Sequence, residues 1–149
     1  MQYREEATSY AQAIMKLDGQ EYAIKTKSYG DSVESTDIEG SSMMSIGRTQ
    51  GAYKTDETSI EMYADDFAEL IERFGEQFFL KTFTVTNTYM PASGSKLKQD
   101  ELVRCRFTKR AASDSAGSDA TTRTLSIKPV LIRWNGKNPL PAALMPKGI

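Results

Sequence analysis

The sequence predicts a single domain, residues 1–149, that is mainly β with one α-helix. Most apolar residues alternate with polar ones at the period of a half-buried strand, whereas one segment alone shows the helical period. A chain of this length can bury most of the surface that its unfolded form exposes. The expected architecture is an antiparallel β-sandwich or partly open barrel, with the helix packed on one side and long loops and terminal arms projecting from it.

The first expected element is a β-hairpin that follows a polar N-terminal arm, residues 1–11. Ala13, Met15 and Leu17 share one face of the first strand. Asp18-Gly19 then supplies the two left-handed positions that a type I′ turn requires. The return strand is expected over residues 22–27.

Residues 28–50 form a long polar segment in which the strand period is lost. Val33, Ile38 and the pair Met43-Met44 are apolar residues that a purely solvated loop does not need. The segment is either a mobile hairpin tip or an arm ordered by a neighbouring subunit. The arm is favoured, because burial of those side chains requires a partner surface.

The glycine-rich stretch over residues 45–53 leads into a short half-buried strand at residues 58–63. Its glycines suit a bend or a close approach to another backbone. A phosphate-binding loop is rejected, because the spacing differs, no Lys-Ser or Lys-Thr pair follows and no helix opens directly after it.

The helix is expected from Asp65 to Phe74, with Gly75 as its stop. Phe67, Leu70, Ile71 and Phe74 follow the i, i+3, i+4, i+7 spacing of one apolar stripe. Because an isolated helix of this length is not stable, the stripe must cover an open face or end of a sheet.

The strands then return, and the first of them has an unusual polar face. Phe79, Phe83 and Val85 are expected on its buried side. The opposite side is a row of threonines that is either a solvent face or the lining of a polar channel: Thr82, Thr84, Thr86 and Thr88.

Two further strands are expected before a C-terminal arm, residues 135–149. Val103, Cys105 and Phe107 should be buried in the first. The second should run over residues 122–134, with Pro129 at an edge or a bulge. Strands with several unpaired edges suit a ring in which each edge is completed by the next subunit.

Composition excludes several kinds of chemistry. The chain has no histidine and one cysteine, so it lacks histidine-based nucleophile systems and zinc sites of ordinary composition. We expect no enzymatic activity and no cofactor or metal. No apolar run is long enough to span a bilayer, and the N-terminus does not resemble a secretory signal, so we expect no membrane insertion and a protein that stays where it is made.

The formal net charge of −1 conceals an uneven distribution. Carboxylates dominate residues 52–76, and lysine and arginine dominate from Lys96 onward. Such a chain can present complementary faces to copies of itself in head-to-tail association. The alternative is that both sets are simply solvated faces.

The order of these features resembles the tail tube proteins of tailed bacteriophages. The similarity extends from about Ala11 to Gly136 and rests on strand order, glycine placement and these segments: Asp18-Gly19, residues 46–54, the helix from Asp66 closed by Gly75, residues 102–106 and Trp134-Asn135-Gly136.

The resemblance implies homohexameric rings that stack into a hollow tube, whose β-barrel lumen conducts double-stranded DNA without specific binding. Thr82, Thr84, Thr86 and Thr88 are the candidate lumen residues. The loop over residues 28–50 would join subunits or rings through these residues: Val33, Asp37, Ile38, Glu39, Met43 and Met44.

The implied partners are further copies of the chain and the sheath, tape-measure, baseplate and terminator proteins of a tail. The protein would be assembled in the cytoplasm of a host bacterium and end in the virion. The chain leaves no room for an added immunoglobulin-like domain, which favours a sheathed, contractile tail.

Three alternatives remain open. The tube protein of type VI secretion or of contractile bacteriocins shares the expected fold, and so does a baseplate tube-initiator. A monomeric β-sandwich that binds carbohydrate or protein is more remote. An enzyme using Asp65 and Asp66 is disfavoured, because adjacent residues in a first helical turn point in different directions.

Overall fold

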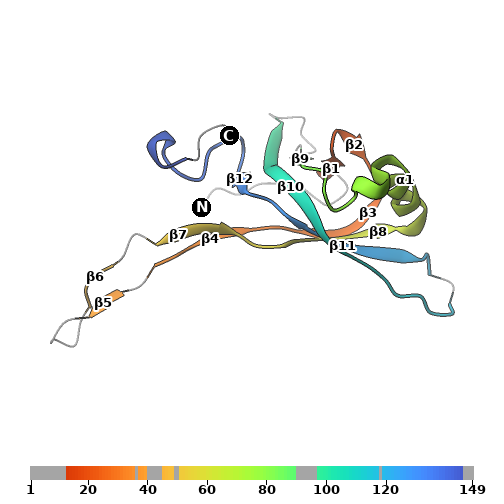
Figure 1. Cartoon of the computed structure of the whole chain (residues 1–149), viewed down its shortest axis with the longest axis horizontal. Coiled ribbons are helices and arrows are strands. Elements are labelled where there is room, and N and C mark those ends of the chain that lie inside the picture. Colours follow the sequence, from red (N-terminus) through yellow and green to blue (C-terminus); the bar gives the residue numbers. More distant parts are fainter. Residues whose placement is uncertain are drawn as a thin grey trace, which may run out of the picture.

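The fold is built on one antiparallel sheet that bends back on itself (Figure 1). The computed structural model describes residues 13–35, 37–39, 45–48, 51–89, 97–117 and 119–145; the predicted N-terminal arm lies outside them. The elements in chain order are β1 (Ala13–Leu17), β2 (Gln20–Glu21), β3 (Ile24–Ser28), β4 (Asp31–Glu34), β5 (Asp37–Glu39), β6 (Ser45–Arg48), β7 (Ala52–Thr55), β8 (Thr58–Tyr63), α1 (Ala64–Phe74), η2 (Gly75–Gln77), β9 (Phe83–Tyr89), β10 (Lys98–Ala112), β11 (Thr122–Lys128), β12 (Leu131–Arg133) and η3 (Ala142–Leu144).

Strand β10 belongs to both halves of this sheet. Its N-terminal part pairs with β9 and β12, and its C-terminal part pairs with β11. The change occurs at Arg104, whose φ of 51° lies in the left-handed region, within a register shift between Leu102 and Cys105. We call β2-β1-β9-β10-β12 the upper half and β10-β11-β8-β3 the lower half, as they lie in Figure 1.

The two halves enclose one hydrophobic core, which confirms the predicted sandwich and leaves the sheet unclosed. Leu17 and Val85 from the upper half and Ile60 and Leu125 from the lower half are fully buried. Cys105 is buried among them, as its place in the alternation predicts.

Helix α1 packs against β8 and β11. Leu70 and Phe74 are buried, and Phe67 and Ile71 are partly buried against the same core. Gly75, with φ of 56°, ends the helix and donates its backbone N–H to the carbonyl of Ile71.

Replacing Leu70 with Ala should lower the free energy of unfolding by about 2–5 kcal/mol, because the side chain has 0% exposure and its loss leaves a cavity. Replacing the neighbouring exposed Glu69 with Ala should change it by about 0.5 kcal/mol or less. Denaturant unfolding of both variants measures the difference. Equal losses would contradict the assigned core.

The predicted hairpin is confirmed at its turn and wrong in its return strand. Asp18 and Gly19 have φ of 54° and 81°, and β1 pairs with β2 at Lys16↔Glu21 and Leu17↔Gln20. The chain then crosses to the lower half, where β3 pairs with β8. Tyr22 is buried in the core at this crossing, so burial overrides local pairing.

The sequence predicts that the strand period is lost over residues 28–50, but the described residues of this segment include strands β4, β5 and β6. Together with β7 they make a two-stranded ribbon that we call the arm. Strand β4 pairs with β7, and farther out β5 pairs with β6. The arm extends β3 and β8 away from the sandwich (Figure 1). Because these strands contain few apolar residues, apolar alternation does not reveal them.

The long strand predicted over residues 122–134 is two strands in different halves. β11 ends at Lys128, and β12 pairs with the upper part of β10. Pro129 lies between them and has no N–H for a ladder. Its carbonyl accepts a hydrogen bond from Thr55 Oγ1 at 2.6 Å.

The strand predicted from Phe79 begins later, at Phe83. Residues 75–77 form η2, and Phe79 and Leu80 are 40% and 63% exposed. Phe78 supplies the buried ring instead, stacked on Phe107 with ring centroids 4.3 Å apart.

Candidate assembly interface

The outward face of the lower half is rich in hydroxyl side chains, and we call it the hydroxyl face. Its directly paired positions form two rows across β3, β8 and β11: Thr26, Glu61 and Thr124, then Ser28, Ser59 and Ser126. Glu61 accepts hydrogen bonds from Thr26 Oγ1 at 3.4 Å and from Thr122 Oγ1 at 2.8 Å. The carboxylate is therefore held within the row by its neighbours.

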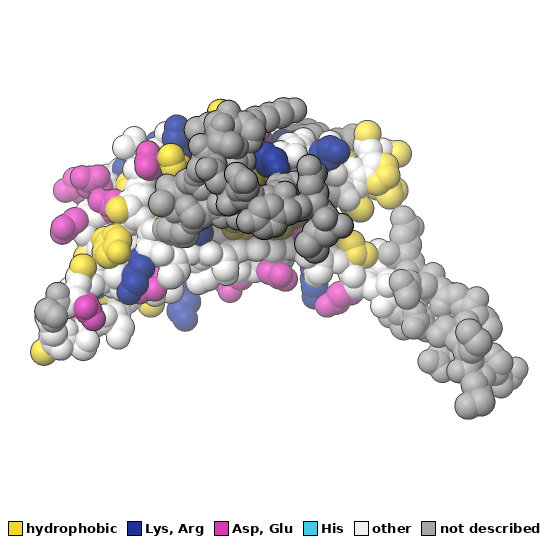
Figure 2. Space-filling model, turned by 180° about the vertical axis from the view of Figure 1, so that it is seen from behind, with side chains coloured by type: hydrophobic (Ala, Val, Ile, Leu, Met, Phe, Trp, Pro, Cys, Tyr) yellow, Lys and Arg dark blue, Asp and Glu magenta, His cyan; other side chains and the backbone are white. Residues whose placement is uncertain are grey.

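Charges of both signs are dispersed over this face. Thr108 Oγ1 donates to Glu57 Oε1 at 2.5 Å, and β10 and β11 place Arg106 opposite Lys128. The outline of the molecule is hollowed along the side on which β3, β8 and β11 run (Figures 1 and 2). The face is thus concave, polar and of mixed charge.

The lower half ends in two long edge strands. In the strand order β3 is terminal, and residues 106–112 of β10 pair with β11 alone among the described strands. The upper half is bounded instead by the short strands β2 and β12. Long edges are templates for pairing with another chain.

The predicted threonine row lies on β9, in the upper half. Thr84 is exposed, Thr86 and Thr88 are half-buried, and Phe83, Val85 and Asn87 point to the other side. Thr86 lies between Lys16 of β1 and Glu101 of β10. Thr82 precedes the strand and accepts a hydrogen bond from Arg106 Nη2 at 3.4 Å.

Among the residues predicted to join subunits, those that the structure describes lie on the arm. Val33 of β4 is 51% exposed. Asp37, Ile38 and Glu39 form β5, and Met43 and Met44 lie outside the described residues. The backbone of the arm thus carries four of the six predicted residues away from the sandwich.

A polar cluster fixes the base of the arm to the upper half, and we call it the root clamp: Tyr29, Asp31, Tyr53, Asp100 and Trp134. Asp31 accepts from Tyr53 Oη at 2.7 Å and from Trp134 Nε1 at 3.0 Å. Asp100, 4% exposed, accepts from Tyr29 Oη at 2.6 Å and from the backbone N–H of Asn135 at 2.9 Å.

The remaining contacts make the clamp one connected network. The rings of Tyr29 and Trp134 stack with centroids 5.2 Å apart, and Tyr53 Oη accepts from the N–H of Ile132 at 3.1 Å. Asn135 and Gly136 have positive φ, which fits the turn that places Asn135 against Asp100. The arm is therefore rooted by hydrogen bonds that span both halves of the sheet.

Glycine is required at residue 51, directly before β7. Gly51 has φ of 79°, and a Cβ there would lie 2.0 Å from the carbonyl oxygen of Glu34. This is the close backbone approach that the sequence predicts for the glycine-rich stretch.

Burial and the hydrogen bond to Asp31 raise the pKa of Tyr53 from 10.0 to about 12. The fold thus favours the neutral phenol, and this contribution to stability is complete below pH 10 and lost as pH rises from 10 to 12. Burial, with the hydrogen bond to Asp100, also raises the pKa of Tyr29.

We therefore expect the free energy of unfolding to fall between pH 10 and pH 12. Tyr53→Phe should be less stable than wild type below that window and should show a shallower decline within it. Denaturant titrations across the window measure both slopes, and parallel slopes would contradict the role of Tyr53.

Signals for these sites were present in the sequence. Thr122, Thr124 and Ser126 alternate visibly with Leu125 and Ile127. The clamp is harder to find, because its members are distant along the chain and meet only through the crossing of the two halves.

The described residues contain no group of histidine, cysteine, aspartate or glutamate that could hold a metal ion. In the same part of the chain, no helix is both long and apolar enough to cross a membrane.

Comparisons with solved structures find the same fold in proteins of very different sequence. The sheath/tube terminator of the PVC extracellular contractile injection system aligns with a TM-score of 0.65 at 8% identity, over 83% of this chain and 93% of that one. Hcp1 from Flavobacterium johnsoniae aligns with a TM-score of 0.59 at 17% identity, over 84% and 95%. A type six secretion system protein aligns with a TM-score of 0.57 at 15% identity, over 86% and 89%.

No family model matches the chain, and no curated protein matches its sequence. The likeness to the solved structures therefore establishes a shared fold.

Proposed function

We propose that this chain is a structural tube protein whose copies join into closed rings that stack into a hollow tube. The observation that carries the proposal is the lower half, a four-stranded sheet with long edges on both sides and a concave hydroxyl face. The fold shared with proteins of contractile injection and type VI secretion systems supports it.

Strand direction makes ring closure by this half geometrically simple. Its four strands alternate in direction, so β3 and the C-terminal part of β10 run opposite ways. Pairing β3 of one copy with β10 of the next continues the antiparallel order. Repeated around a ring, this contact leaves no free edge. We propose six copies per ring, the number that the resemblance of the sequence to tail tube proteins implies.

In such a ring the hydroxyl face lines the channel. A channel through which DNA slides must avoid release of many counterions, because that release is what holds proteins to DNA. Hydroxyl groups and dispersed charges of both signs meet this requirement. The threonine row of β9 is the alternative lining, as predicted from the sequence.

The resemblance to phage tails indicates the cargo. We propose that the tube conducts double-stranded DNA and that a contractile sheath surrounds the tube. Assembly in the host cytoplasm, a final place in the virion tail, and sheath, tape-measure, baseplate and terminator partners belong to the same proposal. The second candidate is a tube of a contractile injection or type VI secretion system, the kinds of assembly to which the similar solved structures belong.

Cysteine labelling distinguishes the two linings. The native Cys105 is 0% exposed, and burial raises the pKa of its thiol to about 12, so it reacts little. Thr124→Cys and Thr86→Cys are treated with a bulky maleimide before and after assembly. We expect assembly to protect Thr124→Cys and leave Thr86→Cys reactive. The reverse pattern would place the β9 threonines in the channel, and reaction of both cysteines would contradict either lining.

A further inference from the structure

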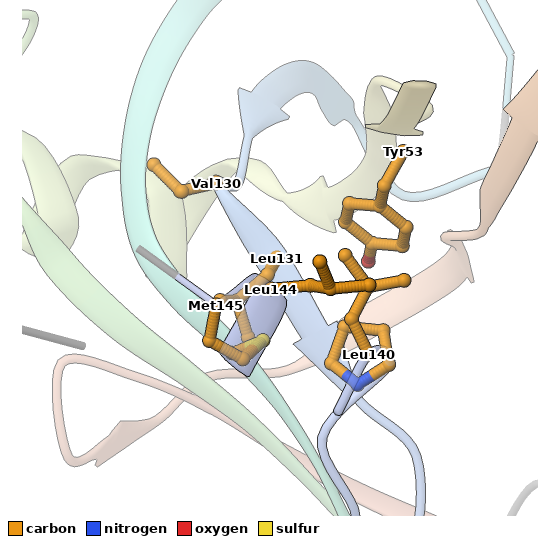
Figure 3. A pocket seen from close by; sticks show the side chains of 7 residues that line it. Tyr53, Val130, Leu131, Leu140, Leu144 and Met145 are labelled. Carbon is orange, nitrogen blue, oxygen red and sulfur yellow. The ribbon is translucent and has the colours of Figure 1, made fainter. Parts of the chain in front are cut away.

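An apolar pocket of about 320 Å³ lies beside the root of the arm. We call it the root pocket. Tyr53 of β7, residues 130–131 and the C-terminal segment line it, and Figure 3 shows Leu140, Leu144 and Met145 gathered around Leu131 and Tyr53. Its volume is at the lower end of the range for ligand pockets, about 300–1,000 Å³. It has room for a few apolar side chains.

The pocket exposes apolar surface that the described part of the chain does not cover. Val130 is 48% exposed and Leu144 is 51% exposed. A gathering of large apolar side chains around a hollow marks a binding surface more strongly than a single exposed residue does.

The outer part of the arm carries several large apolar residues. Residues 37–48 include Ile38, Met43, Met44 and Ile46. In the described residues β5 pairs with β6 alone, and a two-stranded ribbon has no second layer against which to bury side chains. Its apolar residues need a surface from elsewhere.

The outer part of the arm cannot enter the root pocket of its own copy unless the pairing of β4 with β7 is broken. Tyr53 lines the pocket and also pairs with Val33 within the arm. From this pair the strands lead outward to β5 and β6, away from the sandwich (Figure 1). An arm that fills a root pocket therefore belongs to a second copy.

Charge favours the same pairing. The elements that carry the pocket, namely β7, β12 and residues 134–145, contain no carboxylate. Lys54 and Arg133 pair with Glu34 and Glu101 of the same copy, so Lys137 is the cation there without an ion pair among the described residues. The outer arm carries Asp37 and Glu39 against Arg48. Opposite charge around an apolar contact adds specificity.

We propose that the root pocket of one copy receives residues 37–48 of the arm of another copy. The contact is head-to-tail, because each copy offers an arm and a pocket at its root, and it therefore propagates from copy to copy. This inference rests on the proposed tube function and names the contact that joins copies along the tube.

Crosslinking between single-cysteine variants tests the contact. Leu144→Cys and Met43→Cys are mixed in equal amounts, assembled and treated with a short bis-maleimide. The matched control replaces Leu144→Cys with Leu80→Cys, a leucine that is 63% exposed and lies outside the pocket. Mass spectrometry identifies the joined peptides. A built contact should give about tenfold more Met43–Leu144 product than Met43–Leu80 product, because it holds the two thiols at high effective concentration.

A second pair of variants tests necessity. Leu144→Glu should abolish assembly beyond single rings, whereas Leu80→Glu should not, with circular dichroism to verify that both fold. Tubes that form normally but give no excess Met43–Leu144 product, or that survive Leu144→Glu, would overturn the pocket contact and leave the tube function standing. A wild-type chain that never assembles would overturn both.

Discussion

A chain in which residues 35–51 are replaced by Asn-Gly is expected to fold normally and to lose all tube growth. Glu34 and Ala52 are directly paired, so a two-residue type I′ turn can close β4 and β7 into a shorter hairpin. The root clamp stays intact, but the outer arm is gone. Electron microscopy should show rings or smaller species and no tubes, with a melting temperature close to that of wild type.

The site of truncation decides whether this experiment is informative. A deletion beginning at Asp31 would remove the acceptor for Tyr53 and Trp134, and any loss of assembly would then reflect damage at the root of the arm. Tubes of normal length from the chain that lacks residues 35–51 would contradict a role for the arm in growth.

Asp100→Ala is expected to lower the free energy of unfolding by about 3 kcal/mol. The substitution removes a buried charged acceptor and leaves Tyr29 Oη and the N–H of Asn135 without it. The matched control is Asp114→Ala, whose carboxylate is 58% exposed and bonds Arg123. That surface pair should contribute at most about 1 kcal/mol.

Denaturant unfolding of the two variants measures the difference. A loss of assembly at concentrations where Asp100→Ala remains folded would further show that the clamp sets the direction of the arm. Equal, small losses for Asp100→Ala and Asp114→Ala would contradict the clamp.

The elements that were predicted correctly are those whose structure is determined by a few consecutive residues. The Asp18-Gly19 turn needs two left-handed positions, the helix needs one apolar stripe and a glycine stop, and the alternation around Cys105 needs one buried face. Each of these is written in a few consecutive residues, and each is present in the structure.

The parts that the sequence did not predict depend on contacts between distant segments. The predicted return strand over residues 22–27 is wrong because Tyr22 is buried in a core that other strands build. The arm is a ribbon whose stability comes from its ladder and from the root clamp, so its strands need no apolar alternation. The strand over residues 122–134 divides because the chain passes from one half of the sheet to the other at Pro129.

The same distinction between neighbouring and distant residues applies to the candidate site. Composition alone singled out one long segment as the candidate for joining subunits, and its described residues lie on the arm; their role in assembly stays a prediction. The root pocket was not predictable, because Tyr53, Leu131 and Leu144 come together only in the folded chain.

Electron microscopy of the purified full-length protein, with sizing over a range of concentration and salt, tests the tube proposal most directly. We expect hollow rings and, at higher concentration, tubes of constant diameter built from stacked rings. A strictly monomeric protein at every concentration and salt would contradict it.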